Sequence, residues 1–173
     1  MGIQFETDYN METLTAMAKG LRKTVRKKRS RRVHIFAAVV LILGLLTILA
    51  TTAGGEPLGA SGVVTLLAML VVILVSLFED KLNAWFARKR LLPGTEHAAT
   101  FEEDGYVSAT GVTESRFSYA QIVAVAETER YFVFALSSHH TQAYDKRTIR
   151  GGSVEDFRAF IAEKTGKLVE NIK

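Results

Sequence analysis

The feature that most constrains this chain is an apolar block that runs from Ile35 to Phe78. It contains a single charged residue, Glu56, although the 173 residues of the chain include 22 lysines and arginines and 18 aspartates and glutamates. All other charges therefore lie before or after the block. One apolar block between two polar ends argues against an ordinary soluble globule, and 48% hydrophobic residues argue against a disordered chain.

The block divides into two uncharged segments, residues 35–53 and 58–78. At 1.5 Å per residue each segment forms a helix of about 30 Å, which matches the hydrocarbon thickness of a bilayer. Between them, two glycines and Pro57 favour a chain reversal. We therefore predict a transmembrane helical hairpin. Core helices of a soluble bundle would keep a polar stripe, and a cleaved signal peptide would have a shorter leader and a shorter apolar stretch.

Basic residues flank the block on both sides but are missing from the connecting turn. Four follow the second segment. Nine precede the first: Lys19, Arg22, Lys23, Arg26, Lys27, Lys28, Arg29, Arg31 and Arg32. Lysine and arginine near the ends of a span are retained on the cytoplasmic side. We therefore expect both termini in the cytoplasm and a short loop outside.

Residues 11–25 carry apolar side chains at three- and four-residue steps, with Asn10 placed to cap a helix and Glu12 in its first turn. Two interpretations stay open for this basic amphipathic helix. Its basic residues hold it on the anionic inner leaflet, or they only orient the first span. A nucleic-acid patch ranks lower, because the basic run adjoins a span and would face lipid phosphate first.

After the second span, residues 79–92 mix apolar and charged side chains and include Trp85, the only tryptophan. An indole suits the headgroup layer, so we predict a helix that runs along the membrane interface. Pro93 and Gly94 are expected to end this helix and to mark the domain boundary.

From His97 onward, helical spacing gives way to short β-like segments. We predict strands at residues 98–102, 106–110, 115–119, 121–127, 131–137 and 141–146. Asp104-Gly105 favours a hairpin turn between the first two. Ser153 and Asp156 form a capping-box pattern that opens a helix, and Gly166 ends it.

These elements predict an α+β fold, in which an antiparallel meander or partial barrel of about six strands is capped by the C-terminal helix. The segment 131–136 is apolar on both faces and is expected to be a central strand covered on both sides. Residues 3–7 alternate and are a candidate extra strand. The predicted division is 1–34 for the N-terminal strand and basic helix, 35–78 for the hairpin, 79–94 for the interfacial helix and linker, and 95–173 for the domain.

The order of these segments resembles the YcxB-like family of bacterial membrane proteins. The resemblance covers an N-terminal IQFETDY segment, a basic helix, two spans, FEEDG at 101–105, FSYAQI at 117–122, YDKR at 144–147 and DFRAFI at 156–161. It implies a C-terminal domain of pleckstrin-homology-like (PH-like) type, a location in the bacterial inner membrane and no established catalytic activity.

The residues themselves offer little for catalysis. The chain has four histidines and no cysteine, and neither a phosphate-binding loop nor a dinucleotide fingerprint is present. We therefore expect no enzyme activity, no metal, no cofactor and no small-molecule substrate. One candidate anion site consists of Lys146, Arg147, Arg150 and Ser153 near a helix N-terminus. The acidic turn at 102–104 opposes it, because that turn would repel phosphate.

Three functional hypotheses follow. The first is a non-enzymatic membrane protein whose cytoplasmic domain binds another protein, with the bilayer as its other partner and self-association left open. The second is a holin-like two-span protein that permeabilises the membrane. The third is a module that senses anionic lipid. Residues 1–34 carry a net charge of +6 and residues 91–173 carry −3. The acidity of the domain disfavours adhesion to anionic lipid and favours the first hypothesis.

Overall fold

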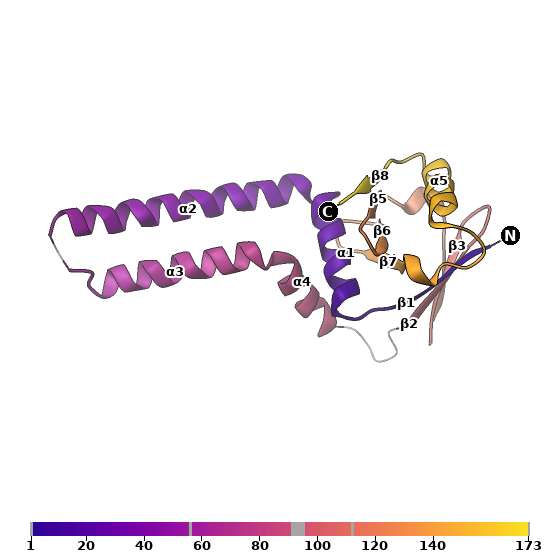
Figure 1. Cartoon of the computed structure of the whole chain (residues 1–173), viewed down its shortest axis with the longest axis horizontal. Helices are drawn as coiled ribbons and strands as arrows, with labels where there is room; N and C mark the ends of the chain where they lie inside the picture. The colour runs from indigo at the N-terminus through magenta and orange to yellow at the C-terminus, as the bar shows by residue number, and fades with distance from the viewer. Residues whose placement is uncertain (1, 56, 91–95, 112, 173) are drawn as a thin grey trace.

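The computed structural model describes residues 2–55, 57–90, 96–111 and 113–172, with the side chain of Glu96 left out, and it has two parts that lie end to end. A long helical hairpin forms one part and an α+β domain forms the other (Figure 1). Two short helices, α1 (Met11–Lys23) and α4 (Glu79–Arg88), lie between them. The chain passes through the domain first, because β1 (Ile3–Asp8) precedes α1.

The hairpin consists of α2 (Lys27–Ala53) and α3 (Ala60–Leu77), so both predicted helices are confirmed. α2 starts eight residues before Ile35. The basic residues from Lys27 to Arg32 therefore belong to the same continuous helix as the first apolar segment. The two helices approach closely at Gly44, where a Cβ atom would lie 2.7 Å from the sulfur of Met69.

The domain contains eight described strands rather than the predicted six, arranged in two four-stranded sheets. The first has the order β1-β2-β3-β4 and is antiparallel throughout, with β2 (Glu96–Phe101), β3 (Tyr106–Thr110) and β4 (Glu114–Phe117). The second has the order β7-β6-β5-β8, with β5 (Ala124–Glu127), β6 (Tyr131–Ala135), β7 (Thr141–Asp145) and β8 (Val169–Asn171). α5 (Val154–Thr165) connects β7 to β8, and β8 pairs in parallel with β5.

The two additional strands come from opposite ends of the chain. β1 confirms the candidate strand at residues 3–7, since Phe5 pairs with Ala99 of β2. β8 does not bury alternate residues. Only one residue of the strand is half-buried, and Leu168, which precedes it, is 89% exposed. Its place is decided by the α5 crossover.

Three predicted strands are shorter than expected because turns replace their ends. Residues 119–121 form a 3-10 turn, η1 (Tyr119–Gln121), which Ser118 caps, so β4 ends at Phe117 and β5 starts at Ala124. A second 3-10 turn, η2 (Lys146–Thr148), follows β7 and ends the strand at Asp145.

Local signals behave as their chemistry predicts. Asn10 accepts hydrogen bonds from the amides of Glu12 and Thr13 at the start of α1. Ser153 and Asp156 form the predicted capping box, and Gly166 ends α5 with a φ of 63°. In the β2–β3 turn, Gly105 is required by crowding, since a Cβ atom there would lie 2.5 Å from the carbonyl oxygen of Phe117.

The core lies between the two sheets and under α5. It is mostly aromatic and consists of Phe5, Ala99, Phe101, Tyr106, Tyr119, Ile122, Val125, Phe132, Phe134, Tyr144, Phe157 and Ile161. β6 is buried at all five positions, as a central strand should be. Phe132 and Phe134 face this core, whereas Tyr131 and Val133 face α1 on the other side.

α1 is therefore an integral part of the domain rather than an appendage to it. A Cβ atom on Gly20 would lie 2.7 Å from Cγ1 of Val133, so the helix backbone rests directly on β6. Thr13 is fully buried, and its hydroxyl donates to the hydroxyl of Tyr131 at 3.2 Å. Together with β1, α1 joins the first 23 residues to the C-terminal core.

Candidate functional site

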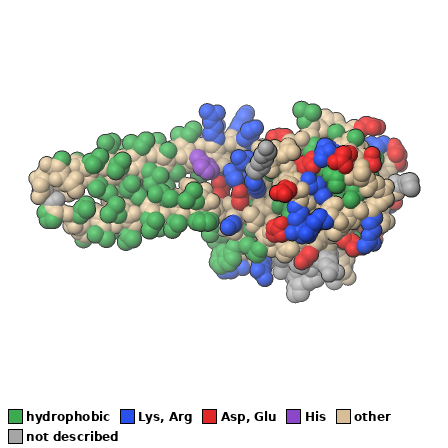
Figure 2. Space-filling view, viewed as in Figure 1, with side chains coloured by type: hydrophobic (Ala, Val, Ile, Leu, Met, Phe, Trp, Pro, Cys, Tyr) green, Lys and Arg blue, Asp and Glu red, His purple; other side chains and the backbone are tan. Residues whose placement is uncertain are grey.

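The hairpin exposes apolar side chains on all sides. Figure 2 shows hydrophobic side chains over the hairpin, and charged side chains over the domain and the junction. No residue of α3 is buried, and Ser30 is the only buried residue of α2. Both helices are long and apolar enough to cross a membrane.

The junction between hairpin and domain is built by α1 packing across α4. Arg22 of α1 donates two hydrogen bonds to the carboxylate of Asp80, from Nε at 2.7 Å and from Nη2 at 2.6 Å. Both side chains are about four-fifths buried, and the hydrogen bonds to Asp80 raise the pKa of Arg22 above its ordinary value. Beside this ion pair, Leu14 and Ala84 pack with Tyr9. This bidentate pair and the apolar contact join the domain to the end of the hairpin.

The start of α2 contacts the domain at a second point. Nε of Arg26 donates to the carbonyl oxygen of Ser138 at 2.7 Å, in the turn that precedes β7. Nδ1 of His34 lies 2.8 Å from the carbonyl oxygen of Ser30, and Nε2 of His34 lies 3.9 Å from Glu79 of α4. The domain thus contacts the start of α2 directly, and α2 in turn lies close to the start of α4.

The predicted membrane-surface residues fall into two groups. Arg22 and Arg26 bind protein groups, and Lys19 lines a groove in the domain. The other basic residues are exposed near the foot of the hairpin: Lys23, Lys27, Lys28, Arg29, Arg31 and Arg32. Trp85 is 45% exposed on α4, and the Nζ atom of Lys89 lies 3.5 Å from its ring centroid.

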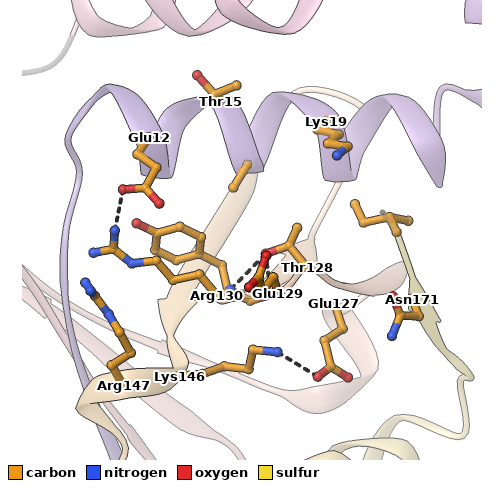
Figure 3. A pocket seen from close by; sticks show the side chains of 13 residues that line it. Glu12, Thr15, Lys19, Glu127, Thr128, Glu129, Arg130, Lys146, Arg147 and Asn171 are labelled. Atoms are coloured by element: carbon orange, nitrogen blue, oxygen red, sulfur yellow. Dashed lines mark hydrogen bonds and ion pairs between the residues drawn. The ribbon is translucent and has the colours of Figure 1, made fainter.

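An open groove of about 1140 Å³ lies beneath α1 (Figure 3). One wall is α1, and the other walls are the β5–β6 turn, η2 and the end of β8. Its lining consists of Glu12, Thr15, Ala16, Lys19, Glu127, Thr128, Glu129, Arg130, Tyr131, Lys146, Arg147, Asn171 and Ile172. Acidic and basic side chains thus alternate around one opening.

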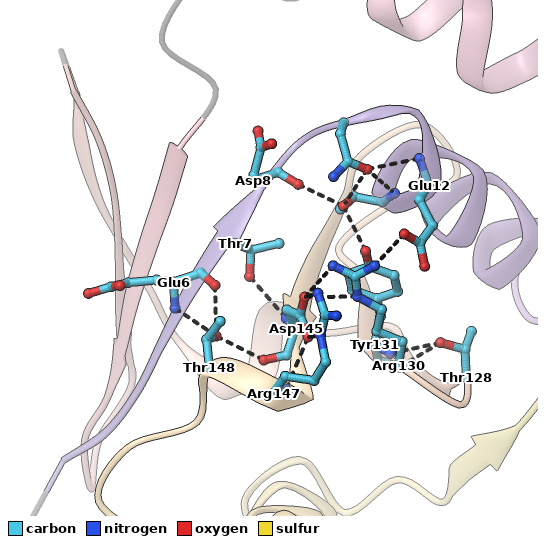
Figure 4. Close-up of polar contacts among 12 residues, drawn as sticks. Glu6, Thr7, Asp8, Glu12, Thr128, Arg130, Tyr131, Asp145, Arg147 and Thr148 are labelled. Carbon is cyan, nitrogen blue, oxygen red and sulfur yellow. Dashed lines mark hydrogen bonds and ion pairs between the residues drawn. The ribbon is translucent and has the colours of Figure 1, made fainter.

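Asp145, which is 4% exposed, organises the acidic and basic groups at one end of the groove (Figure 4). Its Oδ2 accepts from Nε of Arg130 and from Nη2 of Arg147, both at 2.9 Å. Arg130 also binds Glu12 of α1, and the amide of Asp145 donates to Oγ1 of Thr7 in β1. This network joins β1, α1, the β5–β6 turn and β7.

Glu127 organises the other end. It is 4% exposed and accepts from Nε and Nη2 of Arg158 at 2.7 and 2.8 Å, and from Nζ of Lys146 at 2.9 Å. The hydrogen bonds from Arg158, followed by that from Lys146, lower the pKa of the Glu127 carboxyl. The buried carboxylate is therefore fully paired at neutral pH.

The four residues of the predicted anion site are not brought together around an open position. Lys146 binds Glu127, Arg147 binds Asp145, and Arg150 binds Glu6 at 3.2 Å. At the N-terminus of α5, the carboxylate of Asp156 accepts from both the amide and the hydroxyl of Ser153. Each basic group thus already has a carboxylate partner.

Two further titratable groups, His97 and Tyr9, pack against each other. The ring of His97 stacks on Tyr9 at a centroid distance of 3.8 Å, and burial lowers the pKa of His97. Burial also raises the pKa of Tyr9 to about 12. Within the described ranges, no group of three or more histidine, aspartate or glutamate side chains is arranged to hold a metal ion.

Sequence reasoning missed the ion pairs that build the junction and the groove. Arg22 and Asp80 are 58 positions apart, and Glu12 and Arg130 are 118 positions apart. A helical pattern assigns each charge to a polar face but does not identify a partner across the fold. One usable signal was the YDKR segment at 144–147, whose Asp145 and Arg147 bind each other.

The family comparison concerns the C-terminal part of the chain. Residues 101–161, from the end of β2 to α5, match the family model described as YcxB-like protein. Neither the curated proteins nor the solved structures gave a match. Residues 101–161, which hold most of the aromatic core and the carboxylates Glu127 and Asp145, are thus similar to the YcxB-like family.

Proposed function

We propose that this chain is a two-span protein of the bacterial inner membrane, whose hairpin anchors a non-enzymatic domain that binds another protein in the cytoplasm. The observation that carries the proposal is the contrast between an exposed apolar hairpin and a domain with its own buried core. An apolar surface all around a helix pair is unfavourable in water and favourable in lipid.

The exposed basic residues support the orientation. Lys27, Lys28, Arg29, Arg31 and Arg32 occupy the first turns of α2, at the end next to the domain. The positive-inside rule assigns that end to the cytoplasm. The domain and both termini would then share the cytoplasmic side.

The domain architecture supports a PH-like classification. Two four-stranded sheets enclose an aromatic core, and the helix α5 closes it after β7. Such a fold is a scaffold for many functions, so the assignment of a partner depends on the groove rather than on the fold.

The groove beneath α1 favours a polypeptide partner over a phosphate-bearing ligand. Arg130, Lys146 and Arg147 already bind carboxylates, so a phosphate would have to displace one of them. Alternating acidic and basic side chains instead match the mixed charges of a protein surface.

The absence of cysteine makes the membrane topology directly testable. Cysteine is introduced at Gly59, where a Cβ atom meets nothing within 4 Å, or at the exposed Ser115 of β4. In intact cells, a membrane-impermeant maleimide is expected to label Gly59→Cys, and to label Ser115→Cys only after permeabilisation. The reverse pattern would contradict the orientation, and release of the protein by carbonate would contradict insertion.

The partner is testable by site-specific photocrosslinking in intact cells. A photoreactive residue at Thr15 or Glu129 in the groove is expected to give a crosslink to a second polypeptide. The same residue at Glu114 on β4 serves as the matched control, because it is exposed on the other sheet. Equal crosslinks from groove and control positions, or none from the groove, would argue against the groove as the binding surface.

A further inference from the structure

We propose that the outer face of α4 is seated in the headgroup layer of the inner leaflet and binds anionic phospholipid. The inference rests on the proposed insertion of the hairpin and names a second lipid contact outside the two spans. Of the two amphipathic helices next to the hairpin, it assigns the lipid-facing role to α4 alone, and it adds a requirement for anionic lipid.

α4 has two faces with different environments. Ala84 is fully buried against α1, and Asp80, one turn earlier, holds Arg22. Leu82, Trp85 and Phe86 point away from this contact and are 37%, 45% and 55% exposed. Those fractions are similar to the exposure of the hairpin residues themselves, such as Leu70 at 49%. The outer face of α4 therefore continues the apolar surface of the hairpin.

The cations on α4 suit an anionic surface. Lys81, Arg88 and Lys89 are exposed, and within the described part of the chain no carboxylate forms an ion pair with them. Nζ of Lys89 lies over the ring of Trp85, and Nζ of Lys81 lies 5.7 Å from the ring centroid of Phe78. Aromatic rings with adjacent free cations are the side chains expected at lipid headgroups.

The position of α4 in the fold agrees with this assignment. It starts directly after Phe78, the residue that ends α3, and turns away from the hairpin axis (Figure 1). Figure 2 shows hydrophobic and basic side chains together beside the foot of the hairpin. The outer face thus lies at the level where the spanning helices end.

α1 has no comparable free face. Leu14 and Leu21 are buried at 4% and 7% exposure, and the backbone at Gly20 rests on Val133. An apolar face that is covered by protein cannot also insert into lipid, so α4 is the helix that remains available.

The sole tryptophan reports on this surface directly, because Trp85 lies on the outer face of α4. The full-length protein is reconstituted into anionic vesicles in which lipids carry bromine at known chain depths. We expect a blue-shifted emission, strong quenching by bromine near the carbonyl end of the chains and weaker quenching by bromine near the chain ends. Water-like emission without quenching would overturn the proposal.

The charge requirement is tested by lipid composition and by charge reversal. Each lysine or arginine near an anionic surface strengthens binding by about fivefold. The variant Lys81→Glu/Arg88→Glu is expected to reduce quenching in anionic vesicles to the level seen in zwitterionic vesicles. Lys89 is kept because it lies over Trp85. Arg116→Glu/Lys167→Glu, on strand β4 and after α5, is the matched control and should quench as the unmodified protein does.

The outcomes separate this inference from the proposed function. Protein that carbonate strips from the vesicles would contradict insertion of the hairpin. Protein that stays in the vesicles with Trp85 unquenched would overturn only the seating of α4. Equal quenching in anionic and zwitterionic vesicles would overturn the requirement for anionic lipid.

Discussion

α1 and α4 are both short helices with apolar and basic side chains next to the hairpin, yet they use their apolar residues in opposite ways. α1 buries Leu14 against Ala84 of α4 and packs Ala16 and Met17 against Tyr131 and Val133 of β6. α4 buries only Ala84 and leaves Leu82, Trp85 and Phe86 exposed. The comparison shows that an amphipathic pattern predicts a surface to be covered but does not say what covers it.

The difference follows from what each helix is connected to. β1 pairs with β2, and this pairing brings α1 onto the outer face of the second sheet, where Tyr131 and Val133 require a cover. α4 is connected to α3 and packs on the domain mainly through α1. The outer face of α4, with Leu82, Trp85 and Phe86, is therefore not covered by the domain.

The sharpest test of the comparison is a matched pair of leucine truncations. Leu14→Ala in α1 is expected to lower the free energy of unfolding by about 2–5 kcal/mol, because it leaves a cavity beside Tyr9 and Ala84. Leu82→Ala in α4 should change it by less than about 0.5 kcal/mol in detergent. Denaturant unfolding of the full chain, followed by circular dichroism, measures both. Similar losses would contradict the different roles of the two helices.

The ion pair between the helices should have the next largest effect. Arg22→Ala or Asp80→Asn is expected to lower the free energy of unfolding by about 2 kcal/mol. Each substitution removes one partner of an ion pair that is mostly buried. Hydrogen exchange should rise in both α1 and α4. In a double-mutant cycle the combined variant should lose less than the sum of the single variants, and strict additivity would show that the pair is not coupled.

The ion pairs of Glu127 in the groove make the free energy of unfolding depend on pH. The ion pairs of Glu127 lower its pKa below the ordinary value of 4.5. They therefore stabilise the folded state above pH 4.5, and this stability is lost as the pH falls through the folded pKa. Glu127→Gln should cost about 1–2 kcal/mol at neutral pH and should flatten the acid limb of the stability profile. An acid limb identical to that of the unmodified protein would argue against this source.

The smallest expected effect concerns the contact between α1 and β6. Alanine is favoured over glycine in a helix by about 1 kcal/mol, but at Gly20 its Cβ atom would lie 2.7 Å from Val133. Overpacking costs about 1–3 kcal/mol, so Gly20→Ala should be destabilising by about 1 kcal/mol on balance. A loss in Gly20→Ala/Val133→Ala that is smaller than the sum of the two single losses would confirm the contact, and a stabilising Gly20→Ala would contradict it.

Much of the architecture was readable from local patterns. The two apolar segments predicted α2 and α3, Asn10 and Ser153 predicted two helix starts, and Asp104-Gly105 predicted the first hairpin of the domain. These features depend on residues close in sequence, whose hydrogen bonds and periodicity act within one element. The predicted end of the interfacial helix at Pro93 and Gly94 lies outside the described residues.

The candidate site was much less predictable. The basic residues after β7 suggested an anion site, but Lys146 and Arg147 bind Glu127 and Asp145. Their partnership depends on which strands become neighbours, and β8 and α1 reach the groove only through the completed fold. Charges that look free in a sequence are thus paired by contacts between distant segments.

The sequence by itself determined the apolar hairpin, the basic residues at its base and the N-caps of α1 and α5, because hydrophobic length and local hydrogen bonding do not depend on distant contacts. Only the tertiary structure decided that α1 closes the domain, that Arg22 binds Asp80 and that Trp85 stays exposed. Those outcomes depend on which surface covers the apolar face of each helix. The pairing of β1 with β2 places α1 against β6, and this placement decides what covers α1.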